Sequence, residues 1–174
     1  MELPDIPALA LGLGRETQGE GRHWVAALAD APPERLAEMG AAFLRRTAVQ
    51  RKTGKPFYID KLPNNWSYAG FIHLILPNAR IIDARRNPLD CCFSNFRQHF
   101  AKGQAFSYDL AHLGQYYADY VRLMAHFDAV EPGSVYRVIH EQLLENPEGE
   151  IRSLLEFLDL PFEESCLNFQ QNKR

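Results

Sequence analysis

The stretch RIIDARRNPLDCCFSNFRQHF, from Arg80 to Phe100, decides how the rest of the chain is arranged. Ile81 and Ile82 form a short β-branched apolar run, which predicts a buried strand. A helix signal follows at once, because Asn87 is a favoured N-cap residue and Pro88 suits the first helical position. A strand is therefore expected to pass directly into a helix N-terminus.

Two arginines, Arg85 and Arg86, stand at this junction. Free backbone N–H groups and the positive end of the helix dipole attract anions at such a place, and guanidinium groups strengthen the attraction. Ser94 lies two turns further along the same side of the helix, about 10 Å along its axis. An arginine and this hydroxyl could hold a phosphate between them. Arginines at strand ends are also commonly solvated or salt-bridged, and helical serines are usually surface residues, so spacing alone leaves both interpretations open.

The helix after Asn87 carries apolar residues at helical spacing, which predicts one apolar face. These residues are Leu89, Cys92, Phe93, Phe96 and Phe100.

A second strand is predicted at Phe57-Tyr58-Ile59, followed by the segment Asp60 to Asn65 and a helix with an Asn cap. Lys61 then falls at the carboxyl end of a strand, where ligands collect in open α/β sheets. The alternative for Lys61 is an ordinary surface lysine.

The remaining pattern completes an alternation of helices and strands. Long amphipathic helices are predicted from about Glu34 to Lys52 and from about Tyr108 to Phe127, and a third strand from Val135 to Ile139. Asn146-Pro147 predicts the start of another helix. This order predicts an α/β fold with a short parallel sheet, in a single domain spanning residues 1–174.

Composition excludes several classes of protein. With 46% hydrophobic and 24% charged residues the chain is globular, and its net charge of −3 argues against a nucleic-acid partner. No apolar run approaches the roughly 20 residues of a membrane span, and no signal peptide is recognised. Three cysteines provide neither a disulfide framework nor metal-ligand spacing, so we expect no metal and a reducing, cytoplasmic location.

The pattern R-N-P-x-D-x-x-x-S after an apolar strand resembles the 3′-phosphate-binding element of the sulfotransferase family. D-K-x-P-x-N, about 25 residues earlier, is similar to the segment that carries an active-site lysine in bacterial and protein-tyrosine sulfotransferases. The pattern as a whole is most similar to bacterial sulfotransferases associated with tetratricopeptide repeats. The resemblance implies a P-loop-like three-layer fold, with helices flanking the sheet, and in-line transfer of a sulfuryl group to a hydroxyl.

The resemblance also implies roles for single residues. Arg86 and Ser94 would hold the 3′-phosphate of the donor, 3′-phosphoadenosine 5′-phosphosulfate (PAPS), and Lys61 would be catalytic. His140 takes the place of a tyrosine that lies near the nucleotide, and Glu2 falls where the protein-tyrosine branch has its general base. The partners would be this nucleotide and a hydroxyl acceptor, either a protein tyrosine or a small molecule.

The chain departs from the family in the 5′-phosphosulfate loop, a P-x-S-G-T-T-type turn after a strand. No such loop is found, and G-L-G-R near Gly12 follows no predicted strand. Relatives also continue beyond Arg174. The expectation is a domain incomplete at both ends, which binds donor weakly, transfers little or no sulfate alone and self-associates through an exposed sheet edge.

Two further hypotheses stay open. The chain could be a non-catalytic remnant or a nucleotide-binding module that uses the same phosphate site. A nucleotide kinase-like protein would need a Walker loop, which the sequence lacks. No motif identifies the acceptor.

Overall fold

The computed structural model describes residues 4–16, 23–100 and 103–168. The chain divides into two compact units, Met1–Ala79 and Arg80–Arg174, which we call the N-terminal and the C-terminal unit. Each is described by itself.

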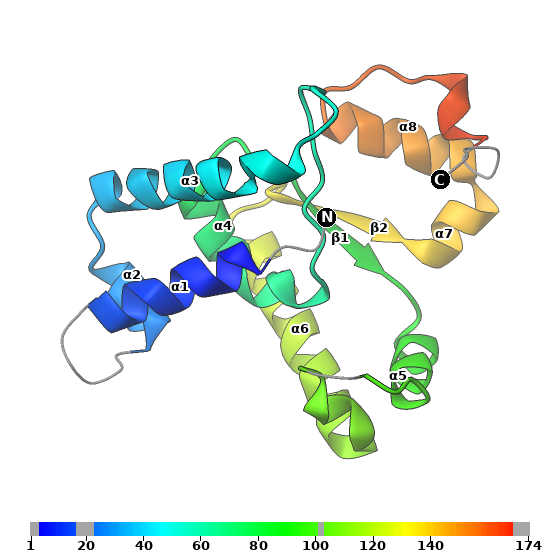
Figure 1. The fold of residues 1–174 in the computed structure, drawn as a ribbon. Helices are drawn as coiled ribbons and strands as arrows, with labels where there is room; N and C mark the ends of the chain where they lie inside the picture. Colours follow the sequence, from blue (N-terminus) through cyan, green and yellow to red (C-terminus); the bar gives the residue numbers. More distant parts are fainter. Residues whose placement is uncertain (1–3, 17–22, 101–102, 169–174) are drawn as a thin grey trace. The chain divides into compact units, whose positions relative to one another are not determined.

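The N-terminal unit is helical (Figure 1). Its elements are α1 (Asp5–Glu16), α2 (Trp24–Ala29), α3 (Pro33–Thr47), η1 (Ala48–Gln50), η2 (Pro63–Tyr68) and α4 (Ala69–Ile75).

A buried apolar cluster holds these helices together, because α1 packs on α2 and α3, and α3 packs on α4. The largest of its side chains are Ile6, Leu9, Leu13, Met39, Phe43, Phe71 and Ile75. The long helix predicted from Glu34 to Lys52 is present as α3 and ends earlier, at Thr47, where a short 3₁₀ turn follows.

The strand predicted at Phe57-Tyr58-Ile59 is wrong, because the structure assigns no strand to these residues. A strand requires a hydrogen-bonded partner, and the two strands that the structure describes pair only with each other. Phe57 is 68% exposed and Ile59 75% exposed, while Tyr58 packs against the cluster. The segment therefore has the residue types of a strand but does not join the sheet that the structure describes.

The Asn-capped helix predicted after this segment also begins differently. A 3₁₀ turn starts at Pro63, after Leu62, and no side chain caps it. Proline suits the first position of a helical turn because its φ is already near the helical value. Asn64 and Asn65 therefore lie inside the turn and do not precede it.

The C-terminal unit contains a short parallel sheet with helices around it (Figure 1). Its elements are β1 (Ile81–Arg85), α5 (Pro88–Phe96), η3 (Ala105–Tyr108), α6 (Leu110–Val130), β2 (Val135–Ile139), α7 (His140–Glu145), α8 (Pro147–Phe157) and η4 (Glu164–Cys166).

β1 and β2 run side by side in parallel register, from Ile81 opposite Val135 to Arg85 opposite Ile139. The connection between them passes through α5 and α6, as parallel strands require a crossover. The predicted parallel sheet is confirmed with two strands in the described residues, whereas the sequence predicted three.

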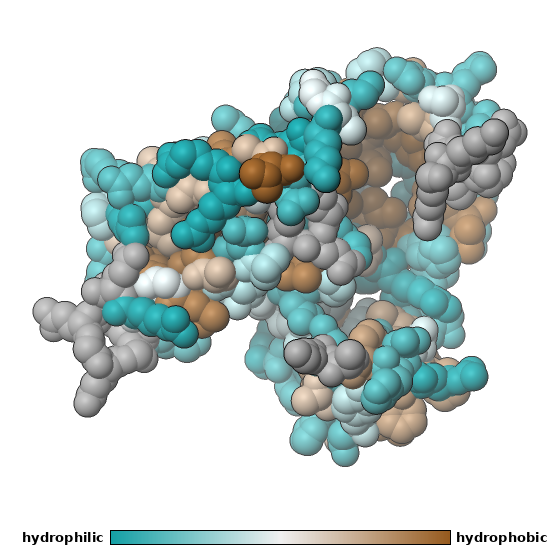
Figure 2. All heavy atoms as spheres, viewed as in Figure 1, coloured by the Kyte–Doolittle hydropathy of each residue, from teal (hydrophilic) through white to brown (hydrophobic). Residues whose placement is uncertain are grey.

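The apolar face predicted for α5 is not buried. Leu89 is 79% exposed and Phe93 59% exposed, and hydrophobic atoms lie at the surface over this helix (Figure 2). The helix packs against α6 and η3, and its half-buried residues include Cys91 and Asn95. Helical spacing shows that one side of a helix is apolar, but not whether another element lies against it.

Candidate functional site

The junction between β1 and α5 forms as the sequence predicted. The side-chain oxygen of Asn87 accepts hydrogen bonds from the backbone N–H groups of Leu89 (3.0 Å) and Asp90 (3.4 Å), so Asn87 is the N-cap. The backbone N–H of Asn87 itself donates to the carboxylate of Glu141 on α7, at 3.0 Å. That hydrogen bond lowers the pKa of Glu141.

These contacts correct one expectation about the junction. The sequence predicted free backbone N–H groups at the helix start, but those of Asn87, Leu89 and Asp90 have acceptors, and that of Cys91 donates to the Asn87 carbonyl. An anion at this helix start would therefore depend on side chains and on the helix dipole.

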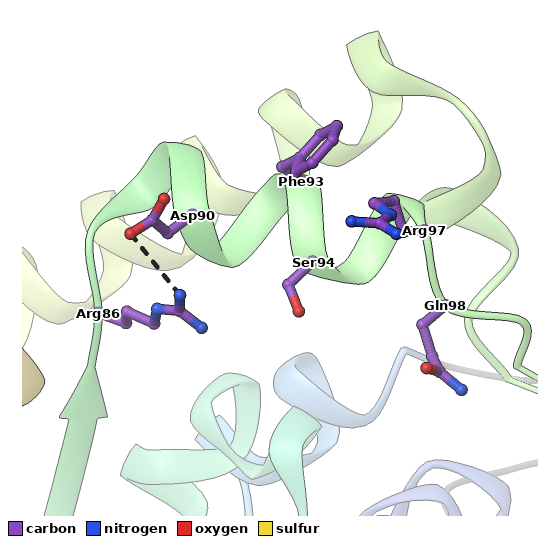
Figure 3. Close-up of a pocket in the computed structure, with 6 residues that line it drawn as sticks. All are labelled: Arg86, Asp90, Phe93, Ser94, Arg97 and Gln98. Carbon is purple, nitrogen blue, oxygen red and sulfur yellow. Dashed lines mark ion pairs between the residues drawn. The ribbon is translucent and has the colours of Figure 1, made fainter.

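A pocket of about 360 Å³ lies along α5 (Figure 3). It is lined by Arg86, Asp90, Phe93, Ser94, Arg97 and Gln98. The two residues predicted to hold a phosphate, Arg86 and Ser94, thus line one pocket, and their side chains point to the same side of the helix (Figure 3). Whether they bind a phosphate stays a prediction.

The charges around the pocket favour an anion. Arg86 and Arg97 are cationic, and Asp90 is the one carboxylate among the lining residues. A guanidinium nitrogen of Arg86 lies 3.6 Å from the carboxylate of Asp90. Because both side chains are largely exposed, this ion pair contributes about 0–1 kcal/mol, and an incoming phosphate could displace it.

The neighbouring arginine, Arg85, makes different contacts. Its guanidinium donates to the carboxylate of Asp83 at 2.7 Å and to the hydroxyl of Tyr120 on α6 at 3.0 Å, and lies 5.0 Å from the centre of the Tyr120 ring. Burial, and next the hydrogen bond to Asp83, raise the pKa of Tyr120, so its hydroxyl stays protonated and donates to that carboxylate. Of the two arginines, only Arg86 is among the residues that line the pocket.

The other predicted site residues lie elsewhere. His140 is the first residue of α7, is exposed and is not among the residues that line the pocket. Lys61 belongs to the N-terminal unit, where it is exposed just ahead of η2. Glu2 lies outside the described residues. Gly12, in the G-L-G-R segment, lies within α1.

Three residues were not predicted from the sequence: Arg97 and Gln98, which line the pocket, and Glu141, which accepts the hydrogen bond from the backbone N–H of Asn87. Arg97 had a usable signal, since residues three apart are neighbours on a helix and Arg97 follows Ser94 by three positions. Glu141 had none, because it lies 54 residues from Asn87 in the sequence.

The described residues lack two kinds of feature. They contain no group of three or more His, Cys, Asp or Glu side chains placed to hold a metal ion. None of the helices in this part of the chain has the length and apolar character that crossing a bilayer requires.

Comparison with known proteins identifies the family. The family model described as "Sulfotransferase family" matches residues 8–164. A protein of Aquifex aeolicus (strain VF5), described as an uncharacterized protein, is 34% identical over 179 residues; the match covers 99% of this chain and 23% of that protein. No solved structure matches. The mixed structure, helices with a short parallel sheet, is consistent with an α/β sulfotransferase fold, and the chain belongs to the sulfotransferase family.

Proposed function

We propose that this chain binds PAPS through the pocket on α5 and takes part in transferring its sulfuryl group to a hydroxyl acceptor. Membership of the family supports sulfuryl transfer. The observation that carries the choice of donor is the presence of Arg86 and Ser94 in one pocket at the start of α5. We place the chain nearest the bacterial branch that is associated with tetratricopeptide repeats, with a protein tyrosine or a small molecule as acceptor.

A 3′-phosphate matches the chemistry of this pocket. Arg86 can donate two parallel hydrogen bonds to phosphate oxygens, and the hydroxyl of Ser94 can donate a further one. Arg97 adds a second positive charge among the lining residues. The occupied N–H groups at the helix start leave recognition to these side chains, so single substitutions should have large effects.

The transfer step needs charge stabilisation and a base. The acceptor oxygen attacks sulfur, the bond from sulfur to the bridging oxygen of the donor breaks, and the acceptor proton passes to the base. In this proposal Lys61 stabilises the charge on the sulfuryl group and the leaving phosphate. Glu2 is the proposed base and His140 a proposed nucleotide contact; both proposals rest on the resemblance in sequence.

A second candidate function is a nucleotide-binding module without catalysis. One observation favours it: in the described residues β1 passes to α5 through Arg86-Asn87, and β2 passes directly into α7, so neither junction contains a glycine-rich phosphate loop. Binding and transfer therefore need separate measurements.

Binding is tested by titrating adenosine 3′,5′-bisphosphate against wild type, Arg86→Ala and Ser94→Ala. Loss of a charge-assisted hydrogen bond should weaken binding by about 10- to 100-fold for Arg86→Ala, and loss of a neutral one by about 2- to 10-fold for Ser94→Ala. Arg122→Ala is the matched control, because Arg122 is an exposed arginine on α6 that pairs with Asp119.

Adenosine 5′-monophosphate separates the 3′-phosphate from the rest of the nucleotide. The Arg86 and Ser94 variants should bind it as wild type does, since it lacks the group they hold. Equal bisphosphate affinity in wild type and Arg86→Ala would overturn the proposal. Transfer from labelled PAPS to tyrosyl and small hydroxyl acceptors then distinguishes an enzyme from a binding module.

A further inference from the structure

A partly buried cluster of charged side chains lies between the sheet and α6 in the C-terminal unit. At its centre is the carboxylate of Asp83 on β1, whose side chain is 6% exposed. It accepts hydrogen bonds from Arg85, from Arg137 on β2 and from the hydroxyl of Tyr120 on α6. A buried carboxylate is stable only when donors compensate the lost water, and here three do.

The charges of this cluster are balanced. Arg137 lies opposite Asp83 in the sheet register and also donates to Asp128 on α6, at 2.8 Å. The cluster thus contains two carboxylates, Asp83 and Asp128, and two guanidinium groups, those of Arg85 and Arg137. Arg85 is therefore paired within this cluster, and its side chain is not among those that line the pocket on α5.

The position of Arg85 also affects Arg86, the next residue. Successive side chains of a strand point to opposite faces, so Asp83 and Arg85 share the face toward α6. Two adjacent arginines could otherwise exchange roles at a strand end, since both side chains are long and flexible. The contacts of Arg85 with Asp83 and Tyr120 hold the side chain of the last residue of β1 on the face toward α6. Arg86, the next residue, then continues the backbone from a fixed end of the strand.

We infer that Tyr120 is a positioning residue for the anion pocket: together with Asp83 it holds Arg85 against α6, which leaves Arg86 as the guanidinium that faces the pocket. This inference rests on the proposed role of Arg86 in binding phosphate. Tyr120 itself is not among the residues that line the pocket, so it would act through the end of β1.

The test is a double-mutant cycle of Tyr120→Phe and Arg86→Ala in the full chain, with adenosine 3′,5′-bisphosphate as ligand and ligand-observed NMR to follow weak binding. Tyr120→Phe removes only the hydroxyl. We expect about three- to tenfold weaker binding in the wild-type background, the range for coupled neighbours, and no change in the Arg86→Ala background. A merely structural role would weaken binding equally in both backgrounds.

Tyr117→Phe is the matched control. Tyr117 lies one turn away on α6 and contacts the Tyr120 ring edge-on, and its hydroxyl makes no hydrogen bond among the described residues. This variant should bind bisphosphate as wild type does. Urea unfolding of every variant reports stability separately from affinity.

The outcomes separate this inference from the proposed function. If Arg86→Ala binds bisphosphate as wild type does, both are overturned. If Arg86→Ala binds weakly and Tyr120→Phe binds as wild type does, or weakens binding equally in both backgrounds, only the positioning role is overturned. If Tyr120→Phe does not fold, Arg85→Lys takes its place. This variant keeps a positive charge beside Asp83 but loses the guanidinium nitrogen that donates to Tyr120. Wild-type affinity in Arg85→Lys would overturn the inference.

Discussion

The backbone N–H of Asn87 donates a 3.0 Å hydrogen bond to the carboxylate of Glu141, which ties the start of α5 to the start of α7. The hydrogen bond favours the charged form of Glu141 and lowers its pKa in the folded protein. The two junctions that follow the parallel strands are thereby joined by one side chain.

The first prediction concerns Glu141→Gln, which keeps an acceptor and removes the charge. A carboxyl group whose pKa falls on folding stabilises the protein fully above its unfolded pKa, about 4.3, and loses this contribution as the pH falls through the folded pKa. Wild type should therefore be more stable than Glu141→Gln at pH 7, and this advantage should be smaller at pH 3. Urea unfolding at both pH values measures it.

The two proteins must be compared with each other because the protonation of Asp109 also lowers stability as the pH falls, and it does so equally in both. The hydrogen bond from the backbone N–H of His112 lowers the pKa of Asp109. Glu145→Gln, at an exposed glutamate on the same helix, is the control variant. An advantage of wild type over Glu141→Gln that is unchanged at pH 3 would contradict the role of the charge.

Asp90→Asn should strengthen the binding of adenosine 3′,5′-bisphosphate. The carboxylate of Asp90 lines the same pocket as Arg86 and competes with phosphate for that guanidinium. Since exposed charges contribute about 0.2–1 kcal/mol, affinity should rise about 1.4- to fivefold, and less at high salt because the effect is electrostatic. Titrations at low and high salt measure this, with Asp119→Asn on α6 as the control. Weaker binding by Asp90→Asn would show that Asp90 orients Arg86 and does not compete with the ligand.

Lys61→Met should lower turnover more than it weakens the binding of the bisphosphate product. The reason is that we assign Lys61 to the sulfuryl group, which the product no longer carries, and interactions made only in the transition state affect kcat. Turnover is measured in a form of the protein that transfers sulfate. Lys55→Met, an exposed lysine six residues earlier, is the control. Equal losses in turnover and product affinity would make Lys61 only a nucleotide anchor.

Gly40→Ala should destabilise the N-terminal unit. A Cβ at Gly40 on α3 would overlap the backbone carbonyl oxygen of Ile75 on α4. Backbone cannot move aside as a flexible side chain can, so we expect a loss of about 1–3 kcal/mol. Gly12→Ala on α1 is the control, because nothing lies within 4 Å of its Cβ, and it should gain about 0.5–1 kcal/mol in helix stability. Urea unfolding compares the two, and a Gly40→Ala protein as stable as wild type would show that α3 and α4 pack less closely.

Features with local causes could be predicted from the sequence. β2 runs from Val135 to Ile139, as the sequence predicted, because β-branched and aromatic residues favour extended backbone. The start of α5 was also predicted correctly, since Asn87 and Pro88 satisfy the helix start within a few residues of one another.

Features that need a distant partner could not be predicted. Phe57-Tyr58-Ile59 has the composition of a strand, but a strand exists only where another segment accepts its hydrogen bonds. Leu89 and Phe93 have the spacing of a buried face, but burial depends on what packs there, and both are exposed. In each case the sequence described the segment correctly and could not describe its surroundings.

The pair Arg85-Arg86 shows the same division within the candidate site. The sequence by itself determined that two guanidinium groups follow a strand and precede a capped helix, because neighbouring residues decide those elements. Only the tertiary structure decided that Arg85 turns to α6, where Asp83 and Tyr120 hold it, and that Arg86 lines the pocket with Ser94. The physical reason is that a charged side chain lies where oppositely charged and hydrogen-bonding groups are available, and here the hydroxyl that completes the set comes from 35 residues away.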